Sequence, residues 1–172
     1  MLKILGGTLI IMTCGIIGLE KPRSFSARIE QLRLLNAGLK MLETEIVYGS
    51  TLLPLAFARI GERFEGPVAS FFQTVARRLQ EDVASGALGA WQEGLQELER
   101  KSSLQTQDIE ILRALGPMLG NSGVGDQVKN LELIRQHLGQ QYLAALEENN
   151  RKGKIWSTMG FLVGITLVLL LY

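Results

Sequence analysis

Apolar residues along the chain follow two patterns: continuous runs at both ends and a helical spacing between them. The two runs, Ile4–Leu19 and Ile155–Tyr172, contain no charged residue. Between them, apolar residues recur three or four positions apart, and nothing alternates with a period of two over a strand length. This pattern predicts an all-α protein. A six-helix bundle at 20–154 would be flanked by transmembrane helices at 4–19 and 155–172.

Glycine, proline and capping residues divide the central region into helices. Gly49 is placed to end the first helix, and Thr51 can cap the second, with Pro54 in its first turn. Gly89 and Gly94 weaken the prediction of the fourth helix. The expected ranges are Ser24 or Ser26 to Tyr48, Leu52–Arg63, Val68–Ser85, Leu88–Arg100, Thr106–Leu115, and a sixth helix after Ser122 to about Arg151. Core stripes are expected at Phe25, Ile29, Leu32, Leu35, Leu39, Leu42 and Ile46; Val68, Phe71, Phe72, Val75, Ala76, Leu79 and Val83; Trp91, Leu95 and Leu98; Ile109, Leu112 and Leu115; and Val128, Leu131, Ile134, Leu138, Tyr142 and Ala145.

The terminal runs are interpreted as membrane spans of roughly 24 and 27 Å, slightly shorter than a hydrocarbon core of about 30 Å. Lys3 can snorkel from the first run, and Trp156 and Tyr172 bracket the second as interfacial anchors. A cleaved signal peptide is the alternative for the first run, although no small-residue cleavage site follows it. Cys14 is interpreted as a small apolar helix residue, with lipid attachment as the alternative.

Basic residues near the two spans predict which side of the membrane the bundle occupies. Only Lys3 lies on the outer side of the first span. Positive residues favour the cytoplasmic side, so the bundle is expected in the cytoplasm and both termini across the membrane. The basic residues on the central side are Lys21, Arg23, Arg28, Arg33, Arg151, Lys152 and Lys154.

Two further features concern the end of the chain. Gly160 and Gly164 form a G-x-x-x-G pattern that allows close helix packing, with chance as the alternative. No proline separates Asp126 from Tyr172, so the sixth helix is expected either to continue into the second span or to break flexibly at Asn149–Gly153.

Composition excludes several classes of chemistry. The chain has 18 Lys and Arg, 17 Asp and Glu, one His and one Cys. The charge division excludes a freely soluble protein, a disulfide-stapled secreted domain and a basic nucleic-acid binder. Cys14 and His137 are expected in different compartments, which excludes a Cys/His metal site or a catalytic pair. We therefore expect no enzyme activity and no cofactor.

Two other patterns resemble sites only superficially. Glu43 and Glu45 point about 200° apart on a helix and cannot share one site, so we expect one solvated carboxylate and one local salt bridge. The glycine-rich segment 120–125 follows a helix rather than a strand, which favours a turn over a phosphate-binding loop. Arg77-Arg78 and Arg100-Lys101 are interpreted as solvated faces.

Two motifs carry a resemblance to a known family. The first is Leu42–Thr51, LETEIVYGST, and the second extends from Asp108 to Leu131. Together with the two spans they resemble the stage III sporulation protein AB family over essentially the whole chain. The second motif consists of Asp108, Leu112, Leu115-Gly116, Leu119-Gly120-Asn121-Ser122, Asp126-Gln127 and Leu131.

The resemblance implies a role in endospore formation, within a secretion-like channel complex in the mother-cell membrane around the forespore. It implies a helical domain similar to the F-type platform proteins of type II secretion and type IV pilus systems. The expected partners are a cytoplasmic secretion-type ATPase, stage III sporulation protein AA, and other channel membrane proteins, with a second copy of the chain as a further candidate. An assembly component of a type II secretion or pilus-like system, or a transporter subunit, is the alternative. The candidate interface or structural residues are Glu43, Glu45, Tyr48, Gly49, Thr51, Asp108, Gly120, Ser122 and Gln127.

Overall fold

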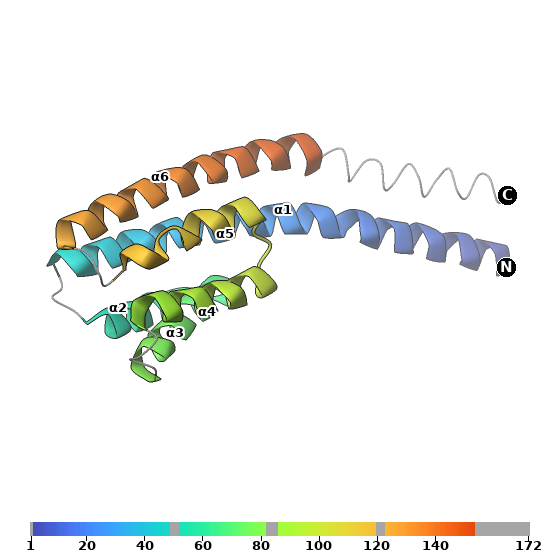
Figure 1. The fold of residues 1–172 in the computed structure, drawn as a ribbon. Coiled ribbons are helices and arrows are strands. Elements are labelled where there is room, and N and C mark those ends of the chain that lie inside the picture. The colour runs from blue at the N-terminus through green and yellow to red at the C-terminus, as the bar shows by residue number, and fades with distance from the viewer. Residues whose placement is uncertain (1, 49–51, 82–85, 120–122, 154–172) are drawn as a thin grey trace. The chain divides into compact units, whose positions relative to one another are not determined.

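The computed structural model describes the backbone of residues 2–48, 52–81, 86–119 and 123–153, and within these ranges the side chains of residues 24–151 (Figure 1). All regular structure in these residues is helical, which confirms the predicted all-α fold with six α-helices. The elements are α1 (Leu2–Tyr48), α2 (Leu53–Gly61), α3 (Gly66–Glu81), α4 (Gly86–Lys101), α5 (Thr106–Arg113), the 3-10 helix η1 (Gly116–Met118), α6 (Val124–Glu148) and the π-helix η2 (Asn149–Gly153).

The chain divides into two compact units. The first contains Met1–Ile29 and Ala144–Tyr172, and the second contains Glu30–Leu143. In the first unit, the guanidinium of Arg28 donates to the carboxylate of Glu148 at 3.3 Å, with the Arg28 side chain almost fully buried. This ion pair joins α1 to α6 within that unit.

The prediction was wrong about the start of the first long helix. α1 begins at Leu2 and continues through Pro22, rather than starting at Ser24 or Ser26. A proline removes one backbone hydrogen bond and crowds the preceding turn, but the remaining i to i−4 bonds of a long helix can span that position. Helix α1 does end at Tyr48, as the sequence predicts.

Aromatic side chains fill the contact between α2, α3 and α4. The ring of Phe71 lies 4.9 Å from those of Phe72 and Trp91, both in edge-on geometry. Phe57 lies 6.2 Å from Phe72 and 6.1 Å from Trp91. All four side chains are fully buried, so each contributes its apolar area and a favourable ring geometry. The predicted inward stripe of α3 and α4 is confirmed at these aromatic positions.

The stripes of α1 and α6 are also largely confirmed. Leu32, Leu35, Leu39 and Leu42 are fully inaccessible to solvent. On α6 the buried apolar residues are Leu131, Ile134, Leu138 and Ala145. The stripes thin at their margins, because Phe25, Ile29, Ile46, Val128 and Tyr142 are half-buried.

Two glycines permit close helix contacts. A Cβ built on Gly94 of α4 would lie 2.6 Å from the Val75 side chain of α3, and one on Gly38 of α1 would lie 2.6 Å from Phe72. The sequence analysis treated Gly94 as a weakness of its helix. In the fold it provides the close approach of α4 to α3, and α4 extends further than predicted, over Gly86–Lys101.

The segment Asn149–Gly153, where the sequence left a flexible break open, is helical in the structure. The helix winds regularly to Glu148 and then continues as one π-helical segment, Asn149–Gly153. Such wide turns within a helix are rare and frequently occur at functional positions. The residues after Gly153 lie outside the described part of the chain.

A helix both long and apolar enough to cross a membrane is not found among the described residues. The side chains of the predicted span 4–19 and the whole of the predicted span 155–172, with Gly160 and Gly164, lie outside the residues described. The two spans therefore stay predictions.

Candidate functional site

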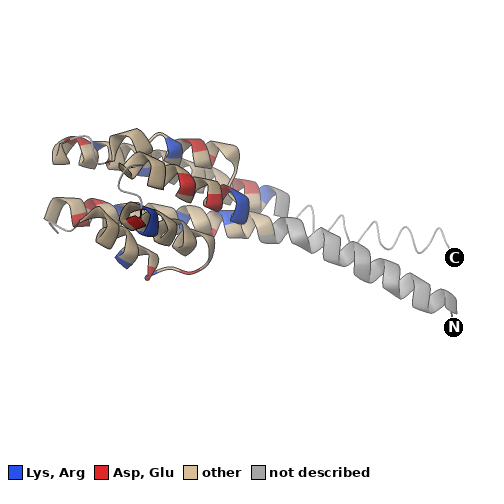
Figure 2. Ribbon diagram, turned by 60° about the horizontal axis from the view of Figure 1, so that its bottom comes forward, with Lys and Arg blue, Asp and Glu red and all other residues tan. Residues whose placement is uncertain are grey.

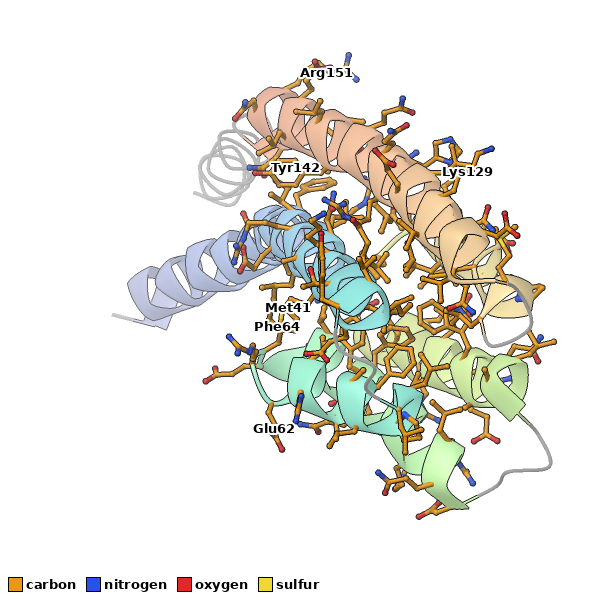
Figure 3. All side chains as sticks on the ribbon, turned by 90° about the vertical axis from the view of Figure 1, so that its left-hand side faces the viewer. Met41, Glu62, Phe64, Lys129, Tyr142 and Arg151 are labelled. Atoms are coloured by element: carbon orange, nitrogen blue, oxygen red, sulfur yellow. The ribbon has the colours of Figure 1, made fainter. Side chains whose placement is uncertain are left out.

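The two motifs, which are far apart in sequence, come to the same end of the second unit. The C-terminus of α1, the start of α2, η1 and the start of α6 all lie there (Figures 1 and 3). We call this region the loop end and define it by six described residues. They are Val47, Tyr48, Leu52, Leu55, Met118 and Val124.

The loop end is rich in exposed apolar side chains. Tyr48 is 84% exposed and Leu52 is 78% exposed, far more than is typical for side chains of this size. Val124, Leu55, Val47 and Met118 are exposed as well. Among the described residues, these six are most of the large hydrophobic side chains that face solvent. Exposed apolar groups gathered in one region typically mark an interaction surface.

The predicted cap of the second helix is wrong. Helix α2 begins at Leu53, so Leu52 rather than Thr51 occupies the N-cap, and it makes no side-chain cap bond. Its carbonyl accepts from the N–H groups of Leu55 and Ala56, and Pro54 lies in the first turn as expected. The other predicted residues of this end, Gly49, Thr51, Gly120 and Ser122, lie outside the described residues.

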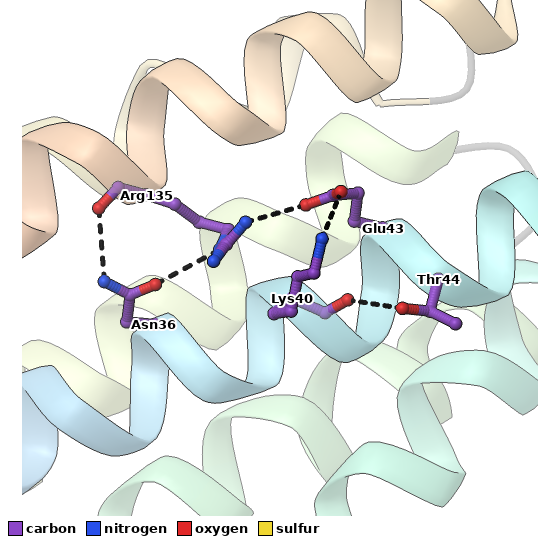
Figure 4. Close-up of polar contacts among 5 residues, drawn as sticks. All are labelled: Asn36, Lys40, Glu43, Thr44 and Arg135. Atoms are coloured by element: carbon purple, nitrogen blue, oxygen red, sulfur yellow. Dashed lines mark hydrogen bonds and ion pairs between the residues drawn. The ribbon is translucent and has the colours of Figure 1, made fainter.

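Glu43 belongs to a polar network that joins α1 to α6 (Figure 4). Its carboxylate accepts from Lys40 Nζ at 2.7 Å and from Arg135 Nη1 at 2.8 Å. Arg135 also donates through Nε to the side-chain oxygen of Asn36 at 3.1 Å, and its carbonyl accepts from the Asn36 amide at 3.2 Å. Because Asn36 meets both the backbone and the side chain of Arg135, the network fixes the register of α6 against α1.

The environment of Glu43 favours its ionised form. Partial burial alone would raise the pKa of this carboxyl, but the hydrogen bond and charge of Lys40 and those of Arg135 outweigh it. The pKa of Glu43 is therefore lowered from its ordinary value. Glu43 therefore takes part in the contact between α1 and α6 as an anion.

Glu45 points away from Glu43, as the helical geometry predicts. Its carboxylate lies 3.8 Å from Arg59 of α2 and is 27% exposed. The two carboxylates therefore serve different neighbours, α6 and α2. The expectation that one of them would be solvated is wrong, because both lie partly buried beside a cation.

Asp108 and Gln127 have structural positions. Asp108 is fully buried, and its carboxylate accepts from the backbone N–H of Gln105 at 2.9 Å, which forms a capping box at the start of α5. Gln127 is half-buried, and its backbone N–H donates to the carbonyl of Gly123 in the first turn of α6. These two residues hold the first turns of α5 and α6 and are not part of the exposed surface of the loop end.

Sequence reasoning missed three polar residues that make contacts between helices. They are Arg28, Asn36 and Gln31, whose side-chain oxygen accepts from the N–H of Ser103 at 2.9 Å. Each lies on or beside the apolar stripe of α1, and this placement is the only indication that the sequence offers.

Side chains that could ligate a metal do not gather at one place in the part of the chain that the structure describes. His137 is exposed on α6. No group of three or more His, Cys, Asp or Glu side chains in the described ranges is placed to hold a metal ion. Basic and acidic residues are interspersed over the helices, without a long face of one sign (Figure 2).

Comparisons with known proteins agree on one family. The family model described as "Stage III sporulation protein AB" matches residues 3–172. The stage III sporulation protein AB of Bacillus subtilis (strain 168) is 32% identical over 171 residues, which cover 99% of each chain. A solved structure of a stage III sporulation protein AB is similar with a TM-score of 0.68 and 30% identity. The match covers 72% of this chain and 96% of that one.

Proposed function

The chain belongs to the stage III sporulation protein AB family and is a sporulation protein; from this premise we propose that it is a non-enzymatic membrane platform that docks a motor ATPase. Its two apolar ends would anchor it in the mother-cell membrane around the forespore. The helical bundle would then present the loop end to a cytoplasmic secretion-type ATPase, stage III sporulation protein AA, within a secretion-like channel complex.

The exposed apolar side chains of the loop end carry the proposal. Tyr48 and Leu52 would gain favourable burial only when another surface covers them, at about 25 cal/mol per Å² of apolar area removed from water. Tyrosine is also enriched among the residues that dominate binding energy at interfaces.

Co-purification with the ATPase tests the docking surface. We expect the full chain in neutral detergent to retain the ATPase, and Tyr48→Ser combined with Leu52→Ser to weaken binding about tenfold or more. The matched control is Leu133→Ser with Leu143→Ser, which removes two exposed apolar side chains from α6 (49% and 60% exposed). Equal binding by the wild type and the loop-end variant, or an equal loss in the control, would contradict the proposed surface.

Cysteine labelling tests the membrane topology on which the partner assignment depends. Single cysteines replace Glu93 and Tyr172 in a chain whose own Cys14 is changed to Ser. An impermeant thiol reagent added outside intact cells is expected to label the C-terminal position and to leave position 93 unlabelled. Labelling of position 93 from outside would place the bundle where a cytoplasmic ATPase cannot reach it.

A further inference from the structure

A surface groove between α3 and α4 holds more positive than negative charge. It has a volume of about 560 Å³, and its lining consists entirely of polar or charged residues. Arg77, Arg78 and Arg100, which the sequence analysis placed on separate solvated faces, all line this groove. The residues that line it are Thr74, Arg77, Arg78, Glu93, Gln96, Glu97 and Arg100.

Each carboxylate of the groove already has its own cation. Glu93 lies 2.6 Å from Arg78 Nε, and Glu97 lies 2.6 Å from Lys101 Nζ. Glu97 also accepts a hydrogen bond from the Thr74 hydroxyl at 2.5 Å. The hydrogen bonds from Lys101 and Thr74 hold the pKa of Glu97 below its ordinary value, so it stays ionised and occupied by these partners.

Two guanidinium groups of the groove have no direct ion pair, although the charge of Arg100 also helps to lower the pKa of Glu97. Arg77 and Arg100 are exposed, and neither forms an ion pair with another residue of the described ranges. They come from different helices and line the same groove, so together they form a pair of fixed positive charges. A guanidinium offers a planar set of donors that matches a carboxylate with two parallel hydrogen bonds.

We propose that the α3–α4 groove binds an acidic segment of a partner protein, with Arg77 and Arg100 each receiving a carboxylate. The neutral residues of the groove and of the smaller hollow beside it, among them Gln96, Gln73 and Ser70, supply donors and acceptors for a peptide backbone. The ionised Glu97 between α3 and α4 disfavours a phosphate, whose charge is more concentrated than that of spaced carboxylates. This inference does not depend on the loop end, which lies on other elements.

Fluorescence anisotropy tests the groove with the full chain in neutral detergent. The probe is a short labelled peptide of alternating Asp and Ala, and its matched control replaces each Asp by Asn. We expect saturable binding of the acidic peptide alone, weaker at ~0.15 M salt than at low salt because exposed charges are screened. Absence of saturable binding, or equal binding of the Asn peptide, would overturn the proposal.

Variants then locate the binding. Arg77→Glu combined with Arg100→Glu is expected to weaken it about tenfold or more, and Arg77→Gln with Arg100→Gln to weaken it less. Arg63→Glu with Lys129→Glu is the control, since Arg63 is exposed in the turn after α2, Lys129 is exposed on α6, and the net charge changes equally. Far-UV circular dichroism checks that each variant folds. If the variant with two Glu substitutions does not fold, the variant with two Gln substitutions decides the test. An equal loss in the control would refute the assignment to the groove.

Competitors distinguish the class of ligand. Inorganic phosphate and vesicles of phosphatidylglycerol are each titrated against the bound acidic peptide. Displacement only at concentrations where ionic strength alone explains it supports a peptide site. Displacement of the peptide by phosphate at micromolar concentration would replace the proposal with a phosphate site. Displacement by vesicles would replace it with a membrane site if vesicle binding is lost only in the Arg77 and Arg100 variants.

Discussion

The contact among α2, α3 and α4 and the contact between α1 and α6 are built from different materials. The first is filled by aromatic rings, and a glycine of α4 allows that helix to approach α3 closely. The second joins Asn36 and Glu43 of α1 to Arg135 of α6 by hydrogen bonds, next to the buried leucine stripe of α1. Apolar packing contributes stability without direction, whereas polar pairs are satisfied at only one register.

Removing a ring from the aromatic contact should have the largest effect. Phe72→Ala deletes a fully buried ring that touches Phe57, Phe64 and Phe71, and we expect a loss of about 3–5 kcal/mol in unfolding free energy. Urea unfolding followed by circular dichroism measures it. Phe64→Ala, at a half-buried ring of the same cluster, should cost clearly less. Equal costs at the two sites would mean that burial does not set the energy of this contact.

Filling the close approach should have the next largest effect. Gly94→Ala places a methyl 2.6 Å from Val75, and we expect a destabilisation of about 1–3 kcal/mol despite the better helix propensity of alanine. Gly125→Ala on α6 is the control, because a Cβ there meets nothing within 4 Å. That change should be neutral or stabilising by up to about 1 kcal/mol. Stabilisation by both changes would show that α3 and α4 can separate freely.

Breaking the α1–α6 network should cost less. Arg135→Met leaves Asn36 and Glu43 without their shared partner, and we expect a loss of about 1–2 kcal/mol, since these side chains are partly exposed. A double-mutant cycle with Glu43→Gln isolates the pair. The exposed pair of Glu30 and Arg33 serves as reference and should couple clearly less strongly, because solvent screens it. Equal coupling energies would remove the distinction between the network and an ordinary surface pair.

The smallest effect concerns pH. The folded-state pKa of Glu43 is lowered, so the unfolded chain binds more protons and the carboxylate stabilises the fold above the ordinary pKa of 4.5. That contribution is lost as pH falls from about 4.5 through the lowered value. Glu43→Gln should therefore show a shallower loss of stability than the wild type between pH 6 and pH 3, measured by urea midpoints. Parallel curves would mean that the network does not depend on this charge.

The apolar part of both contacts could be predicted from the sequence. Leu32, Leu35, Leu39 and Leu42 follow a spacing that the sequence displays directly, and the structure buries all four. The same rule located Trp91 and Phe71, because burial of an apolar side chain needs only a helix face. Helix existence and face were thus predictable in both contacts.

The polar partners were not predictable, because each depends on where another helix lies. Arg135 has no feature in its own helix that indicates Glu43, and Arg77 has none that indicates Arg100. Pro22 led to a wrong prediction of the helix start. The rule that proline ends a helix considers only the neighbouring residues, and α1 is long enough to continue through Pro22. The loop end was predicted only in part, because the sequence analysis identified its motif residues but not their exposure to solvent.

The buried indole of Trp91 gives the molecule a built-in optical reporter. Its Nε1–H donates to the carbonyl of Leu112 at 2.9 Å, which ties α4 to α5 in a dry surrounding. Emission from such an indole is blue-shifted and moves to longer wavelength when water enters. In a Trp156→Phe background, any loosening of α4 by an occupant of its groove would therefore be visible in the intact chain without an attached dye.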